Sequence, residues 1–218
     1  MDAALARCPT EAELALVDAV VILTVVDDPT AGMLVCHRDA GSRDLTRLEE
    51  RAYQAVLSMH RIAFDAPLPW TDRSLFDWFG AAVTEVKFRP DAAVSYCCDG
   101  PGVIVIKSSN MAFLESDLWA ARDGTGFGLM SLVGLLAHEA RHAEGYWHTC
   151  GNLDQTLEEM GAWAIHHYVW IWLAEHAHSA YTTPVNAAPD LYERAAVIAS
   201  RLSATSFCTL PSPSPGRS

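Results

Sequence analysis

The sequence predicts a single α+β domain in which a small mixed or antiparallel β-sheet packs on a set of helices. Several segments carry apolar residues at intervals of three and four, which is typical of amphipathic helices. Between residues 83 and 107, short β-branched and aromatic runs alternate with turns rich in proline and glycine, which indicates strands. The chain of 218 residues is half hydrophobic and is long enough to enclose one substantial core. We expect the domain to cover residues 1–210, with residues 1–40 as an N-terminal elaboration of unclear role and residues 211–218 as a disordered tail.

The N-terminal segment predicts a helix from Glu11 to Val26. Its longest apolar run, Leu14 to Val26, contains Asp18 and is too short to span a bilayer. No basic cluster precedes this run, and Asp27 and Asp28 follow it where a signal peptide would carry small residues. These features predict a cytoplasmic protein with no membrane partner.

The middle of the chain predicts two helices followed by three strands. An amphipathic helix from Asp44 to Ala63 should pack against the sheet, and a shorter helix from Ser74 to Ala82 carries aromatic residues for the core. The strands are expected at Val86–Phe88, Val94–Tyr96 and Val103–Ile106. The last of these either forms a sheet edge that pairs with an extended substrate or, as we favour, lies buried inside the sheet.

Three further helices are expected in the second half of the chain. The first runs from Gly128 to Glu144, the second is a long, apolar helix from Asp154 to Ala177, and the third is an amphipathic helix from Pro189 to Ala204. The first helix should pack on the sheet, and the other two extend the fold at its C-terminal end. The packing face of the Gly128–Glu144 helix is formed by apolar residues spaced three and four apart, which are Leu129, Leu132, Val133, Leu136 and Ala140.

The first of these helices ends in the motif HEARHAEGYWH, residues 138–148. His138 and His142 lie four residues apart, so both imidazoles leave the same face of an α-helix and can bind one Zn²⁺ ion. Glu139 is displaced by about 100° around the helix, which suits a carboxylate that takes a proton from metal-activated water. Gly145 can adopt a positive φ, so the chain can turn back and carry His148 to the metal as third ligand. Three imidazoles leave the fourth tetrahedral position open, as in catalytic zinc sites.

Other residues compete for the third ligand position. Cys150 lies two residues beyond His148, and its thiolate could replace that histidine. Asp154, Glu158 and Glu159 offer carboxylate oxygens, which zinc also accepts, or can orient a ligating histidine by hydrogen bonding. Four downstream histidines are expected to be surface or core residues rather than ligands: His166, His167, His176 and His178.

The cysteine pattern and the net charge limit the cellular environment and the partners that we expect. The six cysteines show no paired CxxC motifs and no dense framework, which is typical of reduced thiols. A bridge from Cys150 to Cys97 or Cys98 stays open if the protein is exported. The net charge of −12, with two lysines against thirteen arginines, argues against nucleic-acid binding and mildly favours a cationic partner.

The motif resembles that of the metzincin clan of zinc metallopeptidases and, more broadly, of the zincin superfamily. The resemblance implies zinc held by His138, His142 and His148, with Glu139 as general base and later as proton donor to the leaving amine. It also implies a zincin-like fold, in which the metal helix follows a mixed sheet, and a peptide or protein substrate. Metzincins carry a methionine-containing turn well downstream of the third histidine; here Met160 is the one methionine in that region, and its context predicts a helix.

We therefore expect a zinc-dependent metallopeptidase with one Zn²⁺ per chain, which hydrolyses peptide bonds through a metal-activated water with Glu139 as general base. The residue that would stabilise the oxyanion is not identified; the candidates are Tyr146, Tyr168 and Tyr181. The alternative is a non-proteolytic metalloenzyme, in which the three histidines hold zinc, iron or copper and a small molecule or peptide is modified. A third hypothesis is a catalytically silent binding module without a stable metal.

Overall fold

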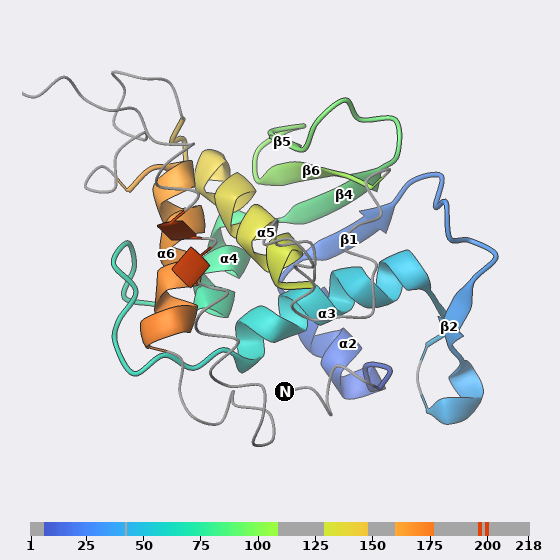
Figure 1. The fold of residues 1–218 in the computed structure, drawn as a ribbon. Coiled ribbons are helices and arrows are strands. Elements are labelled where there is room, and N and C mark those ends of the chain that lie inside the picture. Colours follow the sequence, from blue (N-terminus) through green and yellow to red (C-terminus); the bar gives the residue numbers. More distant parts are fainter. Residues whose placement is uncertain are drawn as a thin grey trace, which may run out of the picture.

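The computed structural model describes residues 7–41, 43–108, 129–147, 160–176, 196–197 and 199–200. This part of the chain contains five α-helices and a small mixed sheet, which confirms the α+β prediction (Figure 1). The helices are α2 (Glu11–Asp18), α3 (Arg47–Arg61), α4 (Leu75–Ala82), α5 (Leu129–Ala143) and α6 (Ala162–Glu175). The sheet contains β1 (Ile22–Val25), β4 (Glu85–Arg89), β5 (Tyr96–Cys97) and β6 (Val103–Lys107). A separate small hairpin joins β2 (Leu34–Cys36) and β3 (Leu45–Thr46), with a short 3₁₀ helix η1 (Arg38–Ala40) between them.

The four-stranded sheet has the order β1-β4-β6-β5. The first three strands are parallel, and β5 pairs with β6 in the antiparallel direction. Since β6 has a partner on each side, Val103–Lys107 is an interior strand, and its Ile104, Val105 and Ile106 have no exposed surface. The interpretation of this run as a buried structural strand is therefore confirmed. The two edge strands of this sheet are β1 and β5.

The predicted helix from Glu11 to Val26 is wrong in its second half. The helix α2 ends at Asp18, and after a short turn the chain forms β1, which pairs in parallel with β4. The β-branched residues that dominate Val20 to Val26 disfavour a helix and suit a strand. This segment of residues 1–40, whose role was unclear from the sequence, thus supplies one strand of the main sheet.

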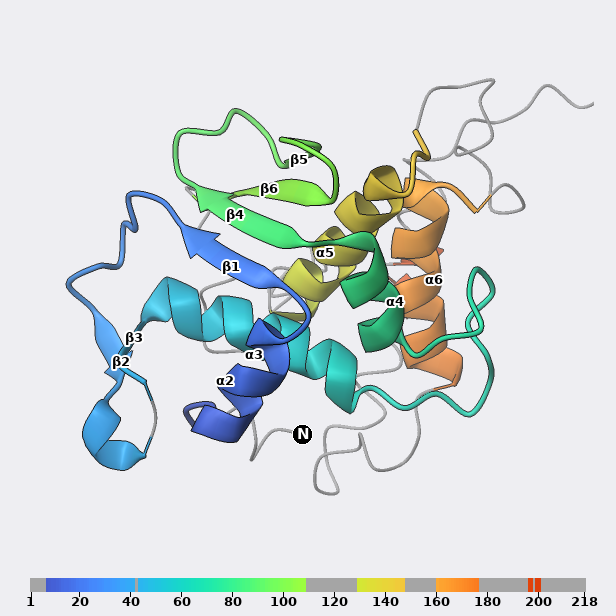
Figure 2. The ribbon, with the colours of Figure 1, turned by 180° about the vertical axis from the view of Figure 1, so that it is seen from behind.

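The helix predicted from Asp44 to Ala63 is confirmed as α3, with a later start. Leu45 and Thr46 pair with β2, and Thr46 then caps the helix in a capping box with Glu49. The helix α3 lies beside β1 in both views of the ribbon (Figures 1 and 2). The predicted Ser74–Ala82 helix is likewise confirmed as α4, with Ser74 as its cap, and its Leu75, Phe76, Trp78 and Phe79 are buried as expected.

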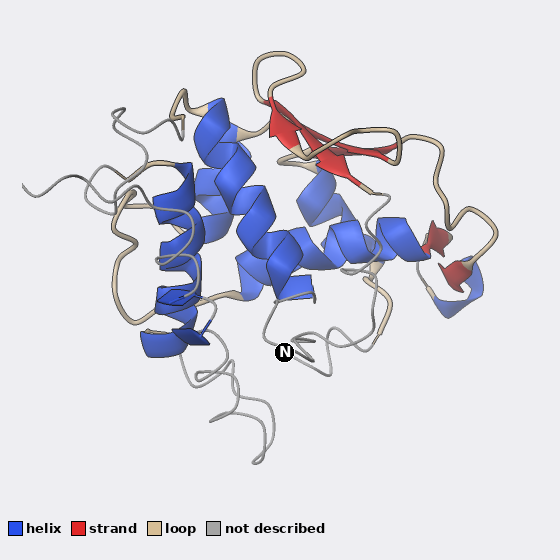
Figure 3. Cartoon of the chain, turned by 45° about the horizontal axis from the view of Figure 1, so that its top comes forward, coloured by secondary structure: helices blue, strands red, loops and turns tan. Residues whose placement is uncertain are grey.

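The helices α5 and α6 pack side by side at the end of the molecule away from the β2-β3 hairpin (Figures 1 and 3). The helix α5 matches its prediction, and all five residues of its predicted packing face are buried. The helix α6 begins later than the predicted Asp154, because Met160 has a φ of 53° and Gly161 is the N-cap. The prediction that Met160 lies in a helix is therefore wrong: it lies in a turn directly before α6. Of the predicted Pro189–Ala204 helix, the four described residues, Ala196, Val197, Ala199 and Ser200, are helical.

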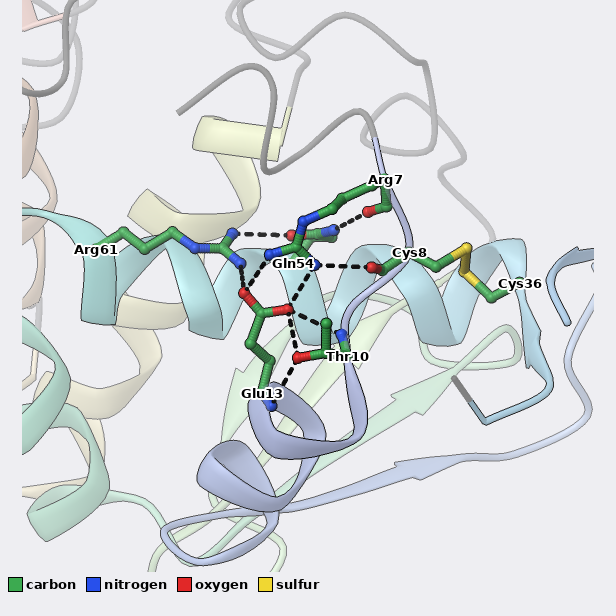
Figure 4. Close-up of polar contacts among 7 residues, drawn as sticks. All are labelled: Arg7, Cys8, Thr10, Glu13, Cys36, Gln54 and Arg61. Atoms are coloured by element: carbon green, nitrogen blue, oxygen red, sulfur yellow. Dashed lines mark hydrogen bonds and ion pairs between the residues drawn. A yellow bond between two sulfur atoms is a disulfide. The ribbon is translucent and has the colours of Figure 1, made fainter. Parts of the chain in front are cut away.

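The expectation of reduced thiols is wrong for the N-terminal segment. Cys8 and Cys36 form a disulfide, with 5.6 Å between their Cα atoms. The segment is also held by polar contacts around Glu13, whose carboxylate binds Arg7 and Arg61, while the amide of Gln54 donates to the carbonyl oxygen of Arg7 (Figure 4). Cys97 and Cys98 are also joined to each other, and no cysteine of the described residues is free. Cys150 lies outside the described residues.

No helix among the described residues is long and apolar enough to cross a membrane. The apolar run that began at Leu14 is divided between α2 and β1. The disordered tail predicted at residues 211–218 also lies outside the described residues.

Candidate metal centre

The helix α5 carries His138, Glu139 and His142 of the motif. Its apolar positions are buried in the common core, which fixes the rotation of the helix. His138 and Glu139 are each only 4% exposed, and His142 is half-buried near the C-terminal end of the helix. The sequence prediction that these side chains project from one helix is confirmed.

The side-chain rings of His138 and His142 lie close together. The centroids of the His138 and His142 rings are 4.8 Å apart, with the ring planes nearly perpendicular at 84°. In a tetrahedral zinc site with zinc–nitrogen distances of about 2.1 Å, two imidazole centroids lie about 5 Å apart. The spacing of these two rings is therefore close to that of two imidazoles on one zinc ion.

The tautomer of His142 is fixed by the turn that follows α5. Its Nδ1 forms a hydrogen bond with the carbonyl oxygen of Tyr146, and because a carbonyl oxygen can only accept, Nδ1 carries the proton. Gly145 has a φ of 95°, as the sequence predicted, and its N–H donates to the carbonyl oxygen of His142 at 2.8 Å. The turn that was expected to return the chain to the metal is thus present up to Trp147.

The candidates for a third ligand lie outside the described residues. His148 and its rivals Cys150, Asp154, Glu158 and Glu159 all fall between residues 148 and 159, which the structure does not describe. Among the residues that it does describe, no group of three or more histidine, cysteine, aspartate or glutamate side chains could hold a metal ion. The described part of the site is therefore the His138 and His142 pair.

Glu139 lies where an acid–base group is useful. Burial raises the pKa of its carboxyl to about 7, although a hydrogen bond from the backbone N–H of Cys97 acts in the opposite direction. Its Oε2 atom is buried and has no hydrogen-bond partner among the described residues. A carboxyl with a pKa near 7 can accept and release a proton at neutral pH.

A cleft of about 790 Å³ joins these groups. One wall is the chain from Ala93 to Cys97, which includes the edge strand β5. Most of the remaining lining comes from α5 and α6. The residues of α5 that line it include His138, Glu139 and His142, which places both histidines and the glutamate in one cavity.

The helix α6 contributes two side chains that the sequence did not assign to the site. Trp163 lies edge-on to His138 with 4.4 Å between ring centroids, and His166 stacks on Trp163 at 5.8 Å. Burial lowers the pKa of His166 to about 4, so this imidazole is neutral at neutral pH. His166 was predicted to be a surface or core residue; the structure places it in the cleft wall, although no described set of ligands includes it.

Gly134 explains how α6 comes so close to α5. A Cβ atom at this position would lie 2.7 Å from Nε2 of His166 and 3.2 Å from Nε1 of Trp170. Gly134 is one helical turn before His138, so it opens the face of α5 that carries the two histidines. A glycine in the interior of a helix indicates a close neighbour. Gly134 could therefore have predicted from the sequence that another segment packs closely on this helix.

The remaining candidates that the structure describes do not line the cleft. His167 bonds to the carbonyl oxygen of Ala199 and His176 pairs with Asp65, as expected for core and surface residues, while His178 lies outside the described residues. Tyr146 stacks under the guanidinium of Arg141 at 3.5 Å. Tyr168 packs against Trp70 and Trp172. Neither tyrosine is part of the cleft lining described here, and Tyr181 lies outside the described residues.

Comparison of the chain with models of protein families, with curated proteins and with solved structures gave no match. Any functional conclusion therefore rests on the residues of the cleft and their geometry.

Proposed function

We propose that this protein is a zinc-dependent metallopeptidase with a zincin-like fold. The observation that carries the proposal is the placement of His138, His142 and Glu139 in one cleft, next to the edge strand of a sheet. The order of elements also supports it, because the metal helix α5 follows a mixed sheet in the chain, as the resemblance to zincins implies. A zinc ion at this position would act as a Lewis acid that polarises a peptide carbonyl and lowers the pKa of water.

Glu139 is the general base of the proposed reaction. Its buried carboxyl, with a pKa of about 7, takes a proton from the attacking water and then returns it to the amine that leaves. The backbone of Cys97, on β5, forms a hydrogen bond with the same carboxyl and favours its ionised form. His138 and His142 hold the metal, and the carbonyl of Tyr146 orients His142 through its Nδ1.

The strand β5 gives the substrate a place to bind. One edge of β5 pairs with β6, and its residues Tyr96 and Cys97 line the cleft. An extended peptide can add to such an edge through backbone hydrogen bonds, which places a peptide bond against the side chains of α5. The sequence suggested this role for Val103–Ile106; the pairing of that strand on both sides transfers it to Tyr96 and Cys97.

The disulfide between Cys8 and Cys36 supports a second proposal, on the compartment. Structural disulfides persist mainly in oxidising environments. We propose that the protein works in such an environment rather than in the cytoplasm that the sequence predicted. Titration of free thiols in protein from an oxidising host compartment tests this: no Cys8 or Cys36 thiol is expected before reduction, and two free thiols at these positions would contradict it.

The peptidase proposal is tested with a diverse peptide library, zinc-loaded protein and detection of products by mass spectrometry. The matched control is the Glu139→Gln variant, with bound metal measured in both proteins. Cleavage by the wild type and none by the zinc-loaded variant is the expected result. If both proteins hold zinc and neither cleaves any peptide, the peptidase proposal fails. Iron or copper in the purified protein, without peptide cleavage, would instead favour a non-proteolytic metalloenzyme.

A further inference from the structure

Two large apolar side chains are exposed at the cleft. Val94 is 63% exposed and Trp147 is 66% exposed, and both line the cavity that contains His138 and Glu139. Val94 lies on the side of β5, and Trp147 follows the C-terminal end of α5. We refer to Val94 and Trp147 as the apolar lips.

The backbone on either side of Val94 is fixed. The Nζ of Lys107 donates to the carbonyl oxygen of Ala93 at 2.9 Å, and the backbone N–H of Lys107 donates to the hydroxyl of Ser95 at 3.0 Å. The residues before and after Val94 are therefore both tied to the end of β6. These two contacts hold the loop in the conformation in which the side chain of Val94 is exposed.

The turn that presents Trp147 is equally well held. The guanidinium of Arg141 stacks on the ring of Tyr146 at 3.5 Å, and the same group donates to the carbonyl oxygen of Met160 and to Glu144, each at 2.7 Å. The indole of Trp147 lies 6.3 Å from the ring of His142, measured between centroids. An aromatic side chain on a fixed backbone loses little conformational entropy when it binds a ligand.

The cleft wall offers few charged side chains to a ligand. Among the described lining residues, Lys107 and Glu139 are the lysine and the carboxylate residue, and the other titratable groups are three histidines and a tyrosine. Lys107 is engaged with Ala93, and Glu139 is only 4% exposed. Ala93, Leu135 and Trp163 add further apolar surface to the same wall. A charged side chain would lose its hydration here without gaining a dedicated partner.

We propose that the apolar lips select a peptide substrate with a bulky apolar side chain, which lies between Val94 and Trp147 beside the reaction centre. This inference rests on the proposed peptidase function for its context, but it concerns binding and can be tested without cleavage. Burial of the two lips against such a side chain removes apolar surface from water on both partners.

The test uses the zinc-loaded Glu139→Gln variant as a binding protein and four fluorescein-labelled peptides of glycine and serine. Each peptide has one central residue, which is Phe, Leu, Asp or Lys. In fluorescence anisotropy titrations, the Phe and Leu peptides should bind at least about tenfold more tightly than the Asp and Lys peptides. In the same background, Trp147→Ala should weaken binding of the Phe peptide about tenfold, and Val94→Thr about threefold, whereas Trp147→Phe should retain most of it.

The matched control is Ile22→Thr, because Ile22 is an exposed apolar residue of β1, 61% exposed, that does not line the cleft. This variant should bind the Phe peptide as the parent does. Circular dichroism and zinc content are measured for every variant, so that a loss of fold or of metal is recognised. Trp147→Phe decides the case if Trp147→Ala fails to fold.

The outcomes separate this inference from the proposed function. If apolar peptides bind preferentially through Val94 and Trp147 but the wild type cleaves no peptide, the binding inference is supported and the peptidase proposal is overturned. Cleavage by the wild type with equal binding of all four peptides overturns the lips alone. If the lip variants change only sedimentation of the protein, so that the lips join two copies of the chain, the inference is also overturned.

Discussion

Two glutamates in this molecule have opposite environments. Glu13, at the start of α2, accepts hydrogen bonds from Arg7, Arg61 and Thr10, and these contacts, first of all the one with Arg7, hold its pKa well below the usual range. Glu139, in the cleft, has one backbone hydrogen bond and no cationic partner in the described residues, and burial raises its pKa to about 7.

The difference teaches how the same side chain serves two purposes. A carboxylate surrounded by donors stays ionised and contributes to stability. A buried carboxyl without such donors exchanges its proton near neutral pH at a cost in stability. The environment of Glu13 therefore suits a carboxylate that stabilises the fold, and that of Glu139 suits a carboxyl that exchanges its proton near neutral pH.

The largest expected effect is on catalysis at Glu139. The Glu139→Gln variant should lose about 10³-fold in kcat/KM on any peptide that the zinc-loaded wild type cleaves, because the general base is removed. Steady-state assays with equal zinc content check this. Glu13→Gln, which lies outside the cleft, is the control. A similar loss of kcat/KM per folded molecule in this variant would contradict the distinction between the two glutamates.

The same substitution should have the opposite effect on the stability of the metal-free protein. Because the pKa of Glu139 is raised from 4.5 to about 7 in the folded state, its contribution is present below pH 4.5 and is lost as the pH rises to 7. At pH 8, Glu139→Gln should therefore be more stable than the metal-free wild type, by on the order of 2 kcal/mol. Urea unfolding between pH 5 and pH 8 measures this; equal pH profiles of the two proteins would contradict it.

Loss of the Cys8–Cys36 disulfide should destabilise the protein by about 3 kcal/mol, since it closes a loop with a sequence separation of 28. The Cys8→Ser, Cys36→Ser double variant is compared with the wild type by denaturant unfolding without reductant. Addition of a reductant to the wild type should reproduce most of the change. An unchanged midpoint would show that the polar contacts of Arg7 and Gln54 hold the segment without it.

The packing of α6 on α5 should be sensitive to Gly134→Ala. The new Cβ would lie 2.7 Å from Nε2 of His166, so we expect a destabilisation of about 2 kcal/mol, despite the better helix propensity of alanine. Zinc affinity should also fall, since His166 and Trp163 lie against His138. Gly32→Ala is the matched control, because nothing lies within 4 Å of a Cβ there; a similar effect of both substitutions would refute the close approach.

The smallest expected effect is that of Glu13→Gln, a loss of about 1 kcal/mol at pH 7, because these contacts lie near the surface. The folded-state pKa of Glu13 is lowered, so its contribution is present above about pH 4.5 and disappears as the pH falls further. The difference in unfolding free energy between wild type and variant should therefore shrink from pH 6 to pH 3. A constant difference over this range would refute the assigned cause.

Local signals in the sequence determined much of the site. The spacing of His138 and His142 places both on one helical face wherever a helix forms, and Gly145 supplies the positive φ of the turn that ends it. The interior strand at Val103–Ile106 was equally readable, because an apolar run acts over a few residues. The capping box of Thr46 and Glu49 is just as local, but the predicted start at Asp44 missed it.

Only the tertiary structure decided the rest, because it depends on contacts between segments distant in the chain. The division of Glu11–Val26 into helix and strand follows from the pairing of β1 with β4, some sixty residues away. The bridge from Cys8 to Cys36, the edge position of β5 and the entry of His166 into the cleft have the same origin. A local pattern fixes which way a side chain leaves its own helix or strand; which other segment it then meets is decided by how the whole chain buries its apolar surface.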